Sequence, residues 1–325
     1  MSNERSRKLA SLANALGPLC GLVFVVALFG ANPAIRQYFL TGANFKIIFV
    51  QTVIVAIGAL GMTIIIISGG IDLSVGSTVA LTSVVGATML LKHQSPAAVA
   101  LATIAAGGVI GLINGSMIAG FRMMPFIVTL GMMGVARGSA KWMADSQTVN
   151  PPENPVNVIM ATSDPDKLFP LPPGVWLTLV LAGIMSLILN RTVFGRYIFA
   201  IGSNEAASRL CGVRVRLQKV LIYSLAGLFF GLAGLLQLSR LTQGDPSIAI
   251  GLELDIIAAV VIGGASLSGG TGSISGSMIG ALIMAVLRNG SNQMGLQTYM
   301  QEIVIGVVII LAVGLDKLRQ RRSAG

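Results

Sequence analysis

The feature that most constrains the fold is an apolar run from Ile47 to Leu91, in which Asp72 is the single charged residue. One helical crossing of a bilayer takes roughly 20 apolar residues, so this run is long enough for two crossings. The pair Gly69-Gly70 marks the junction, because glycine loses the most backbone entropy in a helix. Asp72 or Ser74 can cap the second helix, since both residue types accept backbone N–H groups at helix starts. The run therefore predicts two membrane helices joined by a break.

The break has two interpretations. Irregular backbone at membrane depth occurs only where protein or a water-filled cavity covers it, and broken helices often line transport paths. An ionisable residue such as Asp72 inside a membrane segment is then a functional candidate. Alternatively, the break lies at the membrane surface and Asp72 is an N-cap whose carboxylate is in water. The sequence leaves both interpretations open.

Composition extends the membrane assignment to the whole chain. The sequence is 54% hydrophobic and 10% charged, whereas soluble domains carry about 25% charged residues. We expect residues 1–325 to form one all-α transmembrane permease domain, a helix bundle of about ten segments with short or broken helices at the glycine-rich stretches. The apolar blocks lie at about 9–30, 47–68, 75–91, 97–120, 125–144, 174–190, 218–239, 253–265, 273–289 and 300–316.

Basic residues predict the orientation. Arg5, Arg7 and Lys8 precede an apolar block that is too long for a typical signal peptide, so we expect an uncleaved first helix. With ten crossings both termini share a side, and 14 of the 22 Lys and Arg residues then fall on it. The positive-inside rule makes that side the cytoplasm. The connection 191–218 is then cytoplasmic, and the proline-rich connection 145–173 is external and extended.

The sequence lacks the residue patterns that several classes of function require. The single histidine is His93, and the two cysteines, Cys20 and Cys211, have no metal-site spacing, so we expect no catalytic residue, metal or cofactor. The glycine-rich run Gly263–Gly276 has no P-loop lysine, so ATP hydrolysis requires another subunit. The basic residues flank apolar segments instead of forming a patch, which favours contact with membrane lipid and excludes nucleic acid.

A second glycine-rich break repeats the first. The pattern GGxxLSxG occurs at residues 69–76 and again at 263–270. Paired broken elements of this kind flank translocation paths in transporters. Polar residues on apolar segments can instead form hydrogen bonds between helices. The candidates for the translocation pathway are Gly69, Gly70, Asp72, Ser74, Asn114, Thr129, Ser266, Ser268 and Asn289.

The loop from Asn190 to Lys219 contains a predicted short helix. Ser203 or Asn204 can cap it, Glu205 lies in its first turn, and Gly212 can end it. A short capped helix between two crossings can dock a cytoplasmic partner. It can also be an incidental helix in a basic loop.

Four blocks carry a resemblance to a known family: GGIDLSVGS at 69–77, PFIVTLGM at 125–132, TVFGRYIFAIGSNEAASRLCGVRV at 192–215 and ELDIIAAVVIGGASLSGGTGSISGSMIGA at 253–281. In this order they resemble ABC sugar importer permeases of the ribose, xylose and autoinducer-2 class, within the branched-chain amino acid and ribose permease superfamily. The resemblance implies a bacterial inner-membrane permease, paired with a second copy or a related permease. It also implies two cytoplasmic ATP-binding subunits and a periplasmic substrate-binding protein that delivers a monosaccharide or similar polyol.

The same resemblance suggests residues that couple the chain to its ATPases. The triplet Glu205-Ala206-Ala207 with Gly212 is similar to the coupling element of ABC importer permeases, although its spacing to the glycine is one residue longer than in the commonest form. The candidates for ATPase coupling are Gly195, Arg196, Glu205, Ala206, Ala207 and Gly212. On the external side, Arg137, Lys141 and Arg240 can meet acidic residues of a binding protein or extend to the membrane interface.

Two alternative functions stay open. A branched-chain amino acid permease of the same family would carry a substrate with both charges, whereas the near absence of membrane charge apart from Asp72 favours a neutral polyol. An ion-coupled secondary transporter would use Asp72 as a proton or cation site.

Overall fold

The computed structural model describes residues 17–162 and 167–324; Arg5, Arg7 and Lys8 and the start of the first apolar block lie outside them. Apart from one isolated bridge between Val149 and Gly244, the regular secondary structure of the described residues is helical. The helices are Gly17–Gly30, α2 (Arg36–Phe39), α3 (Gly42–Ile67), α4 (Val75–Leu91), α5 (Pro96–Gly120), α6 (Pro125–Met143), η1 (Pro155–Ile159), α7 (Pro173–Arg191), α8 (Val193–Ser203), α9 (Glu205–Leu210), α10 (Val215–Leu241), α11 (Leu252–Ile262), α12 (Ile274–Gln293) and α13 (Thr298–Ala324).

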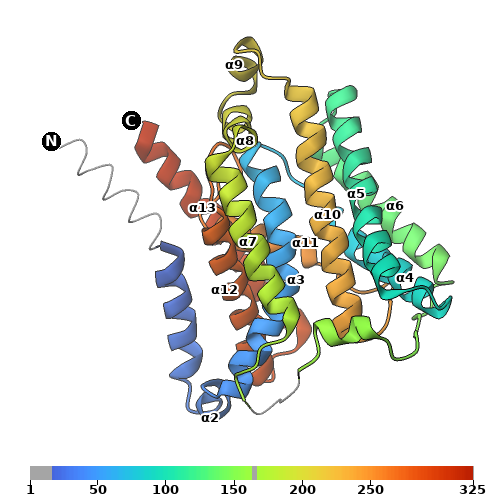
Figure 1. The fold of residues 1–325 in the computed structure, drawn as a ribbon. Helices are drawn as coiled ribbons and strands as arrows, with labels where there is room; N and C mark the ends of the chain where they lie inside the picture. Colours follow the sequence, from blue (N-terminus) through green and yellow to red (C-terminus); the bar gives the residue numbers. More distant parts are fainter. Residues whose placement is uncertain (1–16, 163–166, 325) are drawn as a thin grey trace.

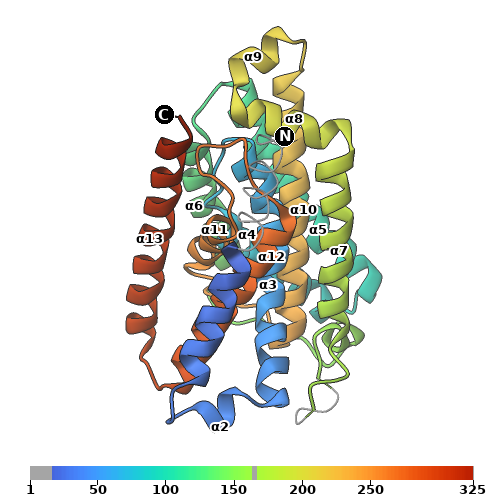
Figure 2. The same cartoon turned by 90° about the vertical axis from the view of Figure 1, so that its left-hand side faces the viewer.

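The long helices lie side by side in one bundle (Figures 1 and 2). Helices α8 and α9 lie at one end of the bundle, which we call the α9 end, and α2 lies at the opposite end, which we call the α2 end. Helix α3 runs through the centre, with 94% of its most apolar window buried. This burial explains why α3 is apolar on every face, since a helix surrounded by other helices needs no polar side.

Glycines bring neighbouring helices into backbone contact. Gly107 and Gly111 of α5 lie against Gly227 and its neighbours on α10, and a β-carbon at Gly107 would overlap the carbonyl oxygen of Gly227. Gly280 of α12 lies equally close to Ala259 of α11. These small residues are therefore helix contacts, the means by which membrane bundles pack closely.

Helices α3, α5, α7 and α10 are each long and apolar enough to cross a bilayer. The sequence left open whether the eighth apolar block crosses the membrane fully. Its helix α11 has 11 residues, which rise about 17 Å at 1.5 Å per residue. That is roughly half of the 30 Å hydrocarbon thickness, so α11 cannot cross a bilayer as a helix. The prediction of an all-α membrane bundle with short helices at the glycine-rich stretches is confirmed.

Two connections differ from the prediction. The loop after residue 191 begins with a full helix, α8, which sequence reasoning missed. The proline-rich connection, expected to be extended, contains the short 3₁₀ helix η1, whose start is capped by the side chain of Asn154. Capping supplies the hydrogen bond that makes this one turn stable.

Candidate functional site

The first glycine-rich break is a tight helix end. The amides of Gly69 and Gly70 donate to the carbonyl oxygens of Ile66 and Ile65 at 2.9 and 3.0 Å, and Gly69 has φ +82°. These two bonds form a Schellman motif, which needs a left-handed residue and therefore favours glycine. The prediction that this glycine pair ends the helix is confirmed.

Asp72 lies in a closed polar cluster just beyond the break. Its carboxylate accepts hydrogen bonds from the Ser74 amide at 2.8 Å, the Ser74 hydroxyl at 2.6 Å and the Asn114 Nδ2 at 3.3 Å. Asp72 is 1% exposed. The interpretation of Asp72 as a cap with its carboxylate in water is therefore wrong, because the surrounding helices bury it. Ser74 is the N-cap residue of α4, but its side chain makes no capping hydrogen bond.

Two further residues close this cluster. The hydroxyl of Thr129 on α6 donates to the carbonyl oxygen of Ile71 at 3.3 Å, although it also bonds within its own helix. Tyr223 of α10 is buried with its hydroxyl against Gly70, where a β-carbon would overlap it. The Tyr223 hydroxyl has no hydrogen-bond partner among the described residues. We call Asp72, Ser74, Asn114, Thr129 and Tyr223 the Asp72 cluster.

The second break has the same helix end in a shifted register. The amides of Gly264 and Ala265 donate to Val261 and Val260 at 2.9 and 3.1 Å, and Gly264 has φ +94°. The sequence pattern aligns Gly69 with Gly263, whereas the structure makes Gly264 its equivalent. Ser266 and Ser268 follow in this loop, where the Ser268 amide donates to the Ser266 Oγ at 3.2 Å.

The two breaks meet at the end of α8. The amide of Gly270 in the second break donates to the carbonyl oxygen of Ile67, the last residue of α3, at 2.8 Å. Gly202 near the end of α8 lies against both groups, and a β-carbon there would overlap the Ile67 oxygen and the Gly270 nitrogen. We call Ile67, Gly202, Gly269 and Gly270 the Gly202 junction. It joins three segments that lie far apart in the sequence.

Helix α9 has the form that the sequence predicts. The side chain of Asn204 accepts the amide of Ala207 at 2.9 Å, Glu205 opens the first turn, and Gly212 follows the helix with φ +84°. Ala206 and Ala207 are exposed, and Leu210 is 90% exposed. Helix α9 therefore presents a small apolar surface at the end of the bundle.

Charged groups hold α9 against α10. The carboxylate of Glu205 accepts from Lys219 Nζ at 2.7 Å and from Arg209 at 2.8 Å. Partial burial alone would raise the pKa of Glu205, but the hydrogen bonds and charges of Lys219 and Arg209 outweigh it and lower the pKa below its ordinary value. Glu205 is therefore ionised at neutral pH. In α8, Gly195 is buried against Leu189, and Arg196 is exposed.

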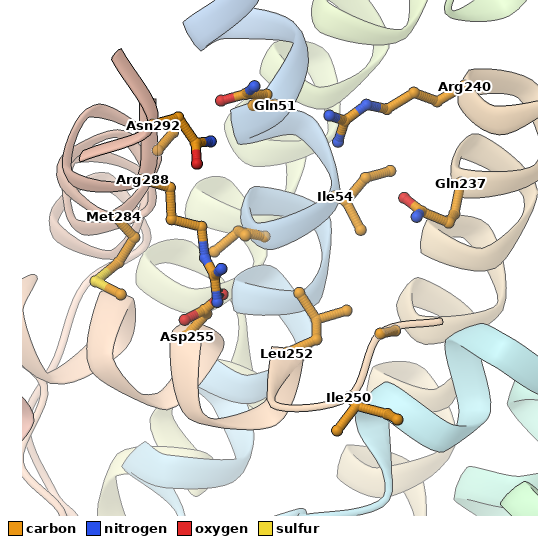
Figure 3. A pocket seen from close by; sticks show the side chains of 13 residues that line it. Gln51, Ile54, Gln237, Arg240, Ile250, Leu252, Asp255, Met284, Arg288 and Asn292 are labelled. Carbon is orange, nitrogen blue, oxygen red and sulfur yellow. Dashed lines mark hydrogen bonds and ion pairs between the residues drawn. The ribbon is translucent and has the colours of Figure 1, made fainter. Parts of the chain in front are cut away.

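A cavity of about 290 Å³ with a mixed polar and apolar lining lies between α3, α10, α11 and α12 (Figure 3). Asp255 of α11 accepts from Arg288 Nε of α12 at 2.8 Å inside it. Asp255 is 3% exposed, so the inference that membrane charge is nearly absent apart from Asp72 is wrong. Sequence reasoning missed Asp255 because it lies at the start of an apolar block and its partner is on another helix.

The external candidates are dispersed. Arg240 lines the cavity of Figure 3. Arg137 donates from one guanidinium nitrogen to the carbonyl oxygens of Pro246 and Ile248 at 2.8 and 2.6 Å, so it holds the segment between α10 and α11 against α6. Lys141 is exposed at the end of α6.

Comparison with known proteins decides the family. The profile described as the permease component of a branched-chain amino acid transport system matches residues 44–313. The chain belongs to this permease family. The ribose import permease of Escherichia coli K12 is 39% identical over 299 residues, with 92% of this chain and 93% of the relative covered. The ribose import permease of Bacillus subtilis is 40% identical over 312 residues, covering 93% and 92%. An L-arabinose permease of Azospirillum brasilense is 34% identical over 304 residues, covering 93% and 88%. No solved structure matches the chain.

The permease gathers most of its predicted pathway residues near the breaks. Gly69, Gly70, Asp72, Ser74, Asn114 and Thr129 surround the first break, and Ser266 and Ser268 lie in the second. Asn289 is separate, because it lies near the α2 end, where it accepts a hydrogen bond from Gln293 at 3.4 Å. Gly202 and Tyr223 also lie at the first break, and sequence reasoning missed both. A small residue inside a predicted loop and an aromatic residue inside an apolar block carry no local signal of such contacts.

Proposed function

We propose that this chain is the transmembrane permease subunit of an ATP-driven, binding-protein-dependent importer for a monosaccharide or similar small polyol. The Gly202 junction is the observation that carries the proposal. It provides a direct backbone connection between the loop expected to meet the ATPases and both glycine-rich breaks. A chain without an ATP site needs such a connection to use the work of another subunit.

The coupling route begins at α9. Its exposed surface of Ala206, Ala207 and Leu210 would rest on an ATP-binding subunit. The Glu205–Lys219 ion pair fastens α9 to α10, and the continuous backbone through Asn204 fastens it to α8. Closure of the ATPases would shift α8 and α9 together. Close backbone contact at Gly202 would pass that shift to the ends of α3 and α11, since packed contacts transmit displacement instead of absorbing it.

The orientation follows from the basic residues. We place the α9 end in the cytoplasm of a bacterium and both termini with it, because the loops at that end carry most of the Lys and Arg residues. The α2 end then faces the periplasm, where a substrate-binding protein docks and where Lys141 is exposed for contact. A second copy of the chain or a related permease completes the membrane part, and two ATP-binding subunits complete the importer.

The starts of the short helices favour an uncharged substrate. In transporters that bind carboxylates, the positive N-termini of broken helices face the anionic group. Here Asp72 precedes α4, and Glu253 and Asp255 lie in the first turn of α11, so these two N-termini have acidic groups of their own, whereas α12 has none in its first turn. This arrangement supports a polyol over a branched-chain amino acid. Relatives named as ribose and L-arabinose permeases point the same way.

The test is reconstitution in proteoliposomes with the ATP-binding subunits and binding protein encoded with this chain. We expect uptake of a monosaccharide that requires ATP and both partners, and no accumulation by the chain alone. The double variant Ala206→Glu, Ala207→Glu should abolish uptake while sugar-independent ATP hydrolysis continues. Ala161→Glu, an exposed alanine in the 145–173 connection, is the matched control and should transport normally. Accumulation by the chain alone, driven by an ion gradient, would overturn the proposal in favour of a secondary transporter.

A further inference from the structure

A basic pocket of about 180 Å³ lies at the α9 end of the bundle. The end of α5, the turn into α6, helix α9 and the start of α10 form its walls, and Figure 1 shows these elements meeting at that end. Four basic side chains, one acid and four small or apolar residues line it: Arg122, Arg209, Arg216, Lys219, Glu205, Ile118, Ala119, Met123 and Val215. Three segments that are distant in the sequence therefore bring like charges to one pocket.

The single acid in this pocket does not balance the basic side chains. Glu205 accepts from Arg209 and Lys219 at 2.8 and 2.7 Å. The guanidinium groups of Arg122 and Arg216 have no hydrogen-bond or ion-pair partner among the described residues. A guanidinium group presents its N–H donors in a planar fork that fits a phosphate or carboxylate. The pocket therefore has unused donors and positive charge for an anion.

The pocket is open to a ligand. Arg122, Arg209 and Arg216 are all exposed, so their guanidinium groups can be reached from the surface of the bundle. The turn between α5 and α6 also exposes large apolar side chains on either side of Arg122, because Phe121 is 77% exposed and Met124 is 69% exposed. Basic and apolar surfaces are thus adjacent at the mouth of the pocket.

The length of α5 places the pocket at the depth of the lipid headgroups. Helix α5 is apolar enough to cross a bilayer and has 25 residues, which rise about 37 Å at 1.5 Å per residue. The hydrocarbon core is roughly 30 Å thick, so the ends of α5 reach the headgroup region. The turn that follows Gly120 contains four residues before α6 begins at Pro125, so Arg122 stays near this depth.

We propose that this pocket binds the headgroup of an anionic phospholipid, with Arg122 and Arg216 donating to its phosphate. Basic pockets between membrane helices bind such headgroups in other proteins. Phe121 and Met124 would contact the acyl chains beside the headgroup, a contact that a soluble anion would not make. The proposal goes beyond the import function and requires only that α5 and α10 cross the bilayer.

A lipid in this pocket would contact the loop that we expect to meet the ATPases. Arg209 of α9 lines the same pocket as Arg122, so a bound headgroup would bridge α9 and the α5–α6 turn. Ile118, which also lines the pocket, lies one helical turn beyond Asn114 of the Asp72 cluster. The lipid would therefore stabilise α9 in its position on the bundle.

Native mass spectrometry of the full chain in detergent tests the site. Phosphatidylglycerol and phosphatidylcholine with identical acyl chains are the probes, and inorganic phosphate is the soluble competitor. We expect one phosphatidylglycerol to bind in preference to phosphatidylcholine and to resist displacement by phosphate. The double variant Arg122→Gln, Arg216→Gln should weaken this binding about thirtyfold, the effect of removing two basic side chains near a membrane surface.

Two further variants serve as controls. Arg122→Lys, Arg216→Lys keeps the charge and should restore most of the binding, which a change of fold in the glutamine variant would not explain. Arg191→Gln, Arg196→Gln removes the same charge from exposed positions outside the pocket and should bind phosphatidylglycerol like the wild type.

Each contrary outcome identifies what is wrong. Equal binding of the two lipids to the wild-type chain, or equal phosphatidylglycerol binding in the pocket variant and the Arg191→Gln, Arg196→Gln control, would overturn the site. Displacement of the lipid by inorganic phosphate would overturn the lipid as its ligand. So would a pocket variant that keeps lipid binding and loses affinity for the ATP-binding subunit, because the pocket would then receive an acidic side chain of that partner. The uptake experiment tests the import function separately from all of these outcomes.

Discussion

At Gly202, a missing side chain lets three segments touch through their backbones. The carbonyl of Ile67 and the amide of Gly270 already share a hydrogen bond, and Gly202 lies against both. Any side chain at this position would separate α8 from the two breaks. Glycine is therefore required here by close approach and not by its own dihedral angles.

Gly202→Ala tests this contact. We expect sugar uptake by the reconstituted importer to fall about tenfold or more, because the added methyl group forces the segments apart at an overpacking cost of about 1–3 kcal/mol. ATP hydrolysis should continue, since α9 is unchanged. The measurement is the ratio of sugar transported to ATP hydrolysed. Gly183→Ala, on α7 where a β-carbon meets no atom within 4 Å, should leave that ratio unchanged.

The pH dependence of the α9 contact follows from Glu205. Its pKa is lowered in the folded chain, so the stabilising contact with Lys219 and Arg209 is present at neutral pH and is lost as pH falls through the lowered pKa, below the ordinary value of 4.5. A nitroxide on the exposed Cys211, in a Cys20→Ser background, should report restricted motion at pH 7 and faster motion only in acid.

Glu205→Gln should give the faster motion already at pH 7, because a neutral amide forms no ion pair. Glu153→Gln should behave like the wild type. If the motion of the label increased between pH 8 and pH 6 in the wild type, the assigned role of Glu205 would be wrong.

At the scale of elements, α5 and α10 depend on glycine for their contact. Gly107 and Gly111 face the α10 backbone so closely that a β-carbon at either would overlap it. Gly111→Ala should lower the free energy of unfolding by about 1–3 kcal/mol. The measurement is thermal unfolding in detergent, with Gly131→Ala on α6 as the control, since that glycine has no neighbour within 4 Å. Equal unfolding midpoints for the two variants would contradict the contact.

Element prediction succeeded where the signal is local. Helix α9 was predictable because Asn204, Glu205 and Gly212 each act within one turn of chain. Helix α8 was missed because Gly195 and Gly202 interrupt it, although two local signals indicate a helix: Thr192 caps its start, and its apolar residues recur at helical spacing. Its stability comes from packing against α7 and the Gly202 junction, contacts that no local pattern records.

At the scale of the whole molecule, the central prediction is that α9 lies on the cytoplasmic side of the membrane. A membrane-impermeant maleimide should label Cys211 of the Cys20→Ser variant in inverted membrane vesicles prepared without the ATP-binding subunits, and should not label it in right-side-out vesicles. Glu153→Cys in a chain lacking both native cysteines should give the reverse result. Labelling of Cys211 from the periplasmic side would place α9 away from any ATPase and would contradict the coupling route.

The sequence by itself determined the class of protein, the helical bundle and the positions of both breaks. A membrane crossing is defined by the hydropathy of about 20 consecutive residues, and a glycine ends a helix within one turn. Both features can therefore be predicted from local sequence. Only the tertiary structure decided that the breaks meet at Gly202, that Asp72 is enclosed by Asn114 and Tyr223, and that Asp255 pairs with Arg288. The partners of a buried polar group are chosen by which helices pack together, and that choice depends on the shape of the whole bundle.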